Sequence, residues 1–115
     1  MYYLAGIVQF DEQLAILRIA GDEVRMTNGR RRRPLSAALK ATRDVIVDLS
    51  DLRFADASLM LDLACLAQRL RAQGRILWLS GAQPNIRTLI ELVGLHRQPA
   101  VRLVGPRPGI ELVTP

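Results

Sequence analysis

Hydrophobic positions along the chain change from alternation in the first part to helical spacing in the second. Alternation predicts one strand over residues 2–10 and another over residues 14–19, separated by a polar turn. In the second strand Ala15, Leu17 and Ile19 fall on one face. The stretch Gly21-Asp22-Glu23 is expected to end it, so the N-terminal part is predicted to form a hairpin.

After the hairpin the pattern alternates between helices and strands. Helices are predicted over residues 34–41, 58–73 and 85–93, and short apolar strands over residues 45–49, 75–80 and 101–104. Such alternation implies right-handed parallel crossovers. We therefore predict one α/β domain of residues 1–115, in which a four- to five-stranded mixed sheet carries helices mainly on one face. Residues 105–115 contain closely spaced glycine and proline and are expected to form a C-terminal tail.

The stretch of residues 45–63 joins the most apolar strand to the longest helix through a polar connection at residues 50–54. Asp56-Ala57-Ser58 opens that helix, and Asp62 follows in its second turn. Backbone N–H groups lack partners at a helix start, and the helix dipole favours negative charge there. Ser58 could therefore cap the helix or carry a phosphate. Asp56 could be the cap itself, which capping preferences favour, or could help to bind metal and orient a hydroxyl during phosphoryl transfer.

Composition indicates a folded protein of the reducing cytoplasm. Half of the 115 residues are hydrophobic and 23% are charged, which argues against disorder. No apolar run approaches the ~20 residues of a membrane span, and no signal peptide is recognisable. Cys65 is the only cysteine and lies in an apolar helical pattern, so we expect a buried thiol and no internal disulfide.

The net charge of +5 includes one dense run, Arg30-Arg31-Arg32-Arg33. Charge runs usually lie in solvated loops, and we expect a loop here. The alternative is a nucleic-acid patch, but no aromatic residues interleave with the arginines to stack on bases. Nucleic-acid binding is therefore the less favoured reading.

Catalytic and cofactor motifs are not recognisable. The single histidine, His96, has no second histidine, cysteine or acidic cluster near it, so no metal site is expected. No Ser/His/Asp arrangement and no Gly-rich phosphate loop is visible. We predict a protein that is not an enzyme and needs no cofactor.

The segment of residues 45–95 resembles the STAS domain of bacterial anti-sigma factor antagonists. The resemblance is carried by Asp48-Leu49-Ser50, by Phe54-Ala55-Asp56-Ala57-Ser58, by Gly74-Arg75 and by Leu89-Ile90-Glu91-Leu92-Val93-Gly94-Leu95. Two positions depart from the family pattern: Ala57 replaces the first serine of a pair, and Leu59 replaces a glycine.

The resemblance implies a protein-interaction module that regulates transcription. In the family an anti-sigma factor with serine kinase activity phosphorylates the serine at the helix start, here Ser58. The unphosphorylated antagonist binds that kinase and frees a sigma factor, and phosphorylation breaks the complex. The partner surface would then include Asp56, Ala57, Ser58, Leu59 and Asp62, and a homodimer is compatible with the sequence. Ala57 and Leu59 leave open a STAS-like module that binds without phosphorylation.

Overall fold

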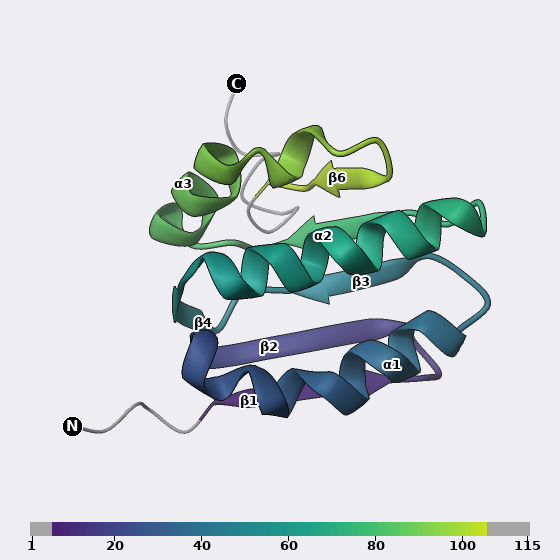
Figure 1. The fold of residues 1–115 in the computed structure, drawn as a ribbon, viewed down its shortest axis with the longest axis horizontal. Helices are drawn as coiled ribbons and strands as arrows, with labels where there is room; N and C mark the ends of the chain where they lie inside the picture. Colours follow the sequence, from purple (N-terminus) through teal and green to yellow (C-terminus); the bar gives the residue numbers. More distant parts are fainter. Residues whose placement is uncertain (1–5, 106–115) are drawn as a thin grey trace, which may run out of the picture.

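A computed structural model describes residues 6–105 of the chain, which fold around one mixed six-stranded sheet (Figure 1). Its main path has the order β1-β2-β3-β5-β6, and β4 pairs with β2 off this path. The β1–β2 pair is antiparallel and every other pair is parallel. The strands are β1 (Ile7–Asp11), β2 (Ile16–Glu23), β3 (Val45–Asp48), β4 (Leu52–Ala55), β5 (Leu77–Ser80) and β6 (Val101–Leu103). The α/β class is confirmed, with one strand more than predicted.

All three predicted helices are present, with ends that differ by at most two residues. They are α1 (Arg32–Lys40), α2 (Ala57–Ala72) and α3 (Pro84–Val93). Helices α1 and α2 lie on the same side of the sheet (Figure 1). The leucine stripe of α2 enters the core between helix and sheet, because Leu59, Leu63 and Leu70 are fully buried. A short 3-10 helix, η1 (Arg25–Arg31), precedes α1, and another, η2 (Leu95–Arg97), follows α3.

Strand β2 extends beyond Gly21, where we expected it to end, and this prediction was wrong. The register shifts after Gly21, and the strand then pairs with β4, so that Glu23 lies opposite Ala55. Strand β4 itself overlaps the polar connection at residues 50–54, where we predicted no strand. The backbone groups of residues 21–23 therefore have partners in β4, and the pairing brings the end of β2 to the start of α2.

Two predictions about exposure were also wrong. The arginine run does not lie in a solvated loop, because residues 25–31 form η1 and Arg31 is buried. Cys65 is exposed, because the leucines of α2 face the sheet and the thiol falls on the outer side of the helix. Of the predicted tail, residues 106–115 lie outside the described residues.

The other buried arginine, Arg75, holds the end of α1. Its guanidinium donates hydrogen bonds to the carbonyls of Ala38 (2.9 Å), Leu39 (3.0 Å) and Arg43 (2.7 Å). Carbonyls at a helix C-terminus have no intrahelical donor, and a cation there also interacts favourably with the helix dipole. Arg75 thus joins the start of β5 to α1.

Candidate functional site at the start of helix α2

Asp56 is the residue that caps helix α2. Its backbone is extended, and its Oδ1 accepts hydrogen bonds from Ser58 N at 3.0 Å and from Ser58 Oγ at 2.5 Å. Its Oδ2 accepts from the backbone N–H of Arg25 at 2.9 Å. The prediction that Asp56 caps the helix is confirmed. Ser58 is the second helical residue instead of the cap, and its hydroxyl stands on the first turn.

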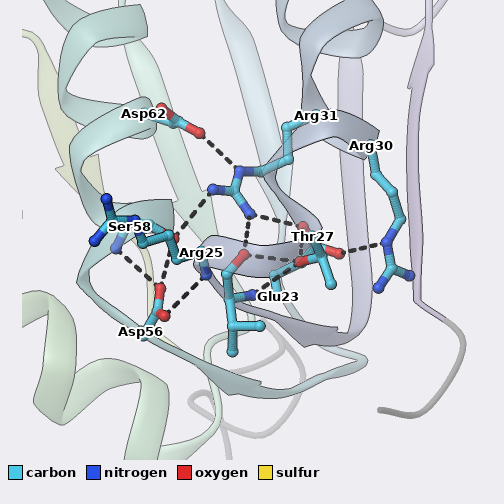
Figure 2. Close-up of polar contacts among 9 residues, drawn as sticks. Glu23, Arg25, Thr27, Arg30, Arg31, Asp56, Ser58 and Asp62 are labelled. Atoms are coloured by element: carbon cyan, nitrogen blue, oxygen red, sulfur yellow. Dashed lines mark hydrogen bonds and ion pairs between the residues drawn. The ribbon is translucent and has the colours of Figure 1, made fainter. Parts of the chain in front are cut away.

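A buried arginine reaches the same hydroxyl from the other side (Figure 2). Arg31 Nη2 donates to Ser58 Oγ at 3.2 Å, and its Nε donates to Asp62 Oδ2 at 2.7 Å. The third nitrogen, Nη1, donates to Glu23 Oε1 at 2.9 Å. The side chain of Arg31 is 1% exposed and that of Glu23 is 0% exposed. Ser58 Oγ therefore donates to a carboxylate and accepts from a guanidinium that is held in place on all of its nitrogens.

The inner side of this site is tied to η1. Thr27 Oγ1 donates to Glu23 Oε1 at 3.2 Å, and Arg30 Nε lies 3.7 Å from Glu23 Oε2. Together with Asp56 and Asp62, three carboxylates face the two guanidiniums of Arg30 and Arg31. The formal charge of these five side chains is thus minus one. A further anion would be repelled unless one of the ion pairs rearranges.

Asp56 is ionised at neutral pH. Partial burial raises the pKa of its carboxyl, but the hydrogen bonds from Ser58 and from Arg25 N, together with the charge of Arg31, outweigh that effect and hold the pKa below its usual value. An ionised carboxylate with a low pKa is a weak base and a good hydrogen-bond acceptor. Asp56 is therefore suited to orient the Ser58 hydroxyl.

A second Asp-x-Ser pair in the chain has the same local hydrogen bonds, but its arginine, Arg18, contacts the aspartate (Nε to Asp48 Oδ2, 3.5 Å) and not the serine. Ser50 Oγ donates to Asp48 Oδ1 at 2.6 Å, and Ser50 N donates to the same oxygen at 3.0 Å. Ser50 precedes strand β4, however, and within residues 6–105 no arginine donates to its hydroxyl. Ser50 is thus a natural reference for what Ser58 gains from its surroundings.

The other predicted site residues differ in their exposure to solvent. Ala57 is exposed, and the Asp62 side chain is 37% exposed while bound to Arg31. Leu59 is fully buried in the core, because it is the first residue of the apolar stripe of α2. Its side chain cannot contact a partner, so its inclusion in the predicted partner surface is corrected.

Sequence reasoning missed both the buried ion pair and two exposed apolar side chains. Leu61 on α2 is 67% exposed, and Phe54 on β4 is 51% exposed. Leu61 lies four residues after Ala57 and therefore on the outward side of the helix, a signal that periodicity alone contained. Glu23 and Arg31 carried no such signal, since their pairing depends on the fold.

Two searches of residues 6–105 gave negative results. No group of three or more His, Cys, Asp or Glu side chains in this range could hold a metal ion. None of the helices described there is long and apolar enough to cross a membrane.

Comparison with known proteins identifies the family. The family profile of the STAS domain matches residues 7–108, and the chain therefore belongs to the STAS domain family. A solved structure described as an anti-sigma-factor antagonist (STAS) domain protein from Planctomyces limnophilus has the same fold, with a TM-score of 0.61 over 94% of this chain and 95% of that one. Their sequences are 15% identical. No curated protein matched the sequence significantly.

Proposed function

We propose that this STAS domain is an anti-sigma factor antagonist of the bacterial cytoplasm, a binding module without enzymatic activity that regulates transcription. It would bind an anti-sigma factor with serine kinase activity and be switched by phosphorylation of Ser58. One observation carries the proposal: Ser58 is only partly buried and lies on the first turn of α2, where the family resemblance puts the phosphorylated serine. A helix N-terminus favours negative charge, so a phosphate there is compatible with the folded domain.

The proposed partner surface combines the polar helix start with exposed apolar side chains. It consists of Asp56, Ala57, Ser58 and Asp62 together with Phe54 and Leu61. Large exposed apolar patches bordered by polar residues mark protein interaction sites, and Phe54 and Leu61 would supply the apolar part of such a surface. A phosphate adds about −1.5 to −2 charges at pH 7. A partner surface that is complementary to a neutral hydroxyl would have to remove water from this charge in order to bind. Phosphorylation would therefore break the complex at the interface.

The chemical step exchanges the O–H bond of Ser58 for an O–P bond. The γ-phosphoryl group of ATP transfers to Oγ, ADP leaves, and the hydroxyl proton passes to a base of the kinase or to solvent. Phosphoryl transfer depends mainly on positioning and on electrostatic stabilisation. Asp56 would contribute by holding Oγ in one orientation on the first turn of α2.

The test is to incubate the protein with ATP and each histidine-kinase-like anti-sigma factor of its source organism. We expect one phosphate on Ser58, located by mass spectrometry, and a complex that dissociates as the phosphate is added. Ser58→Ala should abolish the mass increase, whereas Ser50→Ala, which removes the hydroxyl of the other Asp-x-Ser pair, should leave it unchanged. Phosphate on a different residue, or on none with any partner, would contradict the proposal.

A second candidate is a STAS module that binds its partner without phosphorylation. It is favoured by Leu59, which replaces the family glycine, and by the two hydrogen bonds that already occupy the Ser58 hydroxyl. In that case Ser58→Ala would bind the partner unchanged, and ATP would have no effect. The nucleic-acid alternative has less support, because Arg30 and Arg31 are directed to Glu23.

A further inference from the structure

We propose that Arg31 is the internal counter-ion of a phosphate on Ser58, and that phosphorylation transfers this guanidinium from Asp62 to the phosphate. The inference rests on the proposed function in one respect, namely that Ser58 accepts a phosphate. Inside the domain, Arg31 would then have two alternative anionic partners: Asp62 when Ser58 is unmodified, and the phosphate when Ser58 is phosphorylated.

The geometry of the guanidinium supports the exchange. Nε and Nη2 lie on the same edge of the planar group, where Nε now donates to Asp62 at 2.7 Å and Nη2 to Ser58 Oγ at 3.2 Å. Two oxygens of a phosphate match such an edge, since arginine binds phosphates and carboxylates through two parallel hydrogen bonds. A phosphate attached to Oγ would begin within reach of Nη2, and it would compete with Asp62 for Nε.

Burial determines which partner moves. Glu23, which is 0% exposed, holds Nη1 at 2.9 Å, so Arg31 cannot leave without taking the closest cation from a buried carboxylate. Asp62 is 37% exposed on its side chain and can turn toward water at little cost. The expected result is that the guanidinium stays, the phosphate takes its outer edge, and Asp62 is released as a free negative charge on α2.

Phosphorylation also changes the interaction between Ser58 and Asp56. The Oγ–H bond that donates to Asp56 Oδ1 is lost, and a dianion replaces it beside a carboxylate. Without Arg31 this repulsion would act unopposed except by the helix start. Arg31 is 1% exposed, so its attraction is screened by solvent much less than that of a surface arginine.

The test measures the second pKa of phosphoserine placed at position 58 during translation, which needs no kinase. A pH titration followed by 31P NMR should give a value below the ordinary value of about 6. Arg31→Gln should raise it by about 1 unit or more, as expected for the loss of an adjacent opposite charge. Arg32→Gln removes the same charge from the next, exposed residue and should change it by only a few tenths.

Two further variants separate pairing from general electrostatics. Asp62→Asn should lower the phosphate pKa when Arg31 is present, because it removes the competitor, and should have a smaller effect in the Arg31→Gln background. Phosphoserine at position 50, beside Asp48, should not respond to Arg31→Gln. Equal shifts for Arg31→Gln and Arg32→Gln, or an Asp62→Asn effect independent of Arg31, would overturn the proposal.

The outcomes distinguish this inference from the proposed function. A kinase screen that leaves Ser58 unmodified would contradict the proposed function, while the encoded phosphoserine would still report on Arg31. If Arg31→Gln unfolds the domain, the Asp62→Asn variant retains the arginine, and an unchanged phosphate pKa in that variant would refute the exchange.

Discussion

Replacing Arg31 by methionine should destabilise the domain strongly, because it removes the closer of the two ion-pair partners of buried Glu23. Methionine keeps the unbranched apolar stem but has no N–H group. Glu23 is 0% exposed and would retain Thr27 Oγ1 at 3.2 Å and Arg30 Nε at 3.7 Å. Removing one partner of a buried pair costs about 3–5 kcal/mol. Since these remaining contacts offset part of the loss, we expect about 3 kcal/mol for Arg31→Met.

The double variant Glu23→Gln/Arg31→Met measures the coupling energy between these two residues. Glu23→Gln alone leaves Arg31 bound to Asp62 and Ser58, so we expect a loss of about 1 kcal/mol, as for one hydrogen bond. If the two effects were independent, the double variant would lose about 4 kcal/mol. A neutral amide beside methionine removes the unpaired buried charge, so we expect a loss of about 2 kcal/mol and a coupling of similar size.

The assay is urea unfolding at pH 7, followed by the fluorescence of Trp78 and by far-UV circular dichroism. Arg32→Met is the matched control, because that side chain is the next in the run and is exposed. It should change the free energy of unfolding by no more than about 0.5 kcal/mol. A loss below about 1 kcal/mol for Arg31→Met, or strict additivity in the double variant, would refute the argument that this pair is a buried and coupled unit.

Three other predictions follow from named contacts. Asp56→Ala should cost about 1 kcal/mol at pH 7 through loss of the cap. Because the pKa of Asp56 is lowered in the folded state, that difference should be present above its unfolded value of about 3.9 and disappear as pH falls through the folded value, in unfolding curves measured across this range. Arg75→Met should cost about 3 kcal/mol in urea unfolding, since the hydrogen bonds from Arg75 to the carbonyls of Ala38, Leu39 and Arg43 are lost, whereas exposed Arg71→Met should change little. Leu61→Asp should weaken binding of the kinase-type anti-sigma factor at least about tenfold in calorimetry, whereas Leu14→Asp, exposed at the opposite end of β2 from Glu23, should not.

The helices and most strands could be predicted because their signals are local. The apolar spacing of α2 and the short runs that form β3 and β5 are contained within each segment. Strand β4 has no such signal, since its four residues carry no alternation and become a strand only by pairing with residues 21–23. Gly21 ordinarily interrupts a strand, and here it marks the point at which β2 changes partner.

In the candidate site, too, the residues with local signals could be predicted and the others could not. Asp56 and Ser58 could be predicted from their spacing at a helix start, where capping and charge preferences act within a few residues. The role of Arg31 could not, because four consecutive arginines do not indicate which of them faces the core. Which arginine faces the core depends on where the fold buries a carboxylate that needs a cation. That carboxylate belongs to Glu23, which lies eight residues before Arg31, in the part of β2 that was not predicted.

The unpredicted pairing of β2 with β4 is the physical origin of the serine's surroundings. It carries Glu23 to the start of α2, where the backbone N–H of Asp56 donates to the Glu23 carbonyl at 3.2 Å. A carboxylate buried there requires a cation, Arg31 supplies it, and the same guanidinium then meets Ser58 Oγ. Ser50 has the same local turn with Asp48 but no such carboxylate beneath it. A STAS domain with neutral residues in place of Glu23 and Arg31 should therefore cap α2 equally well, yet hold a phosphate on this serine with a higher second pKa than the present domain, which 31P titration of such a double variant would measure.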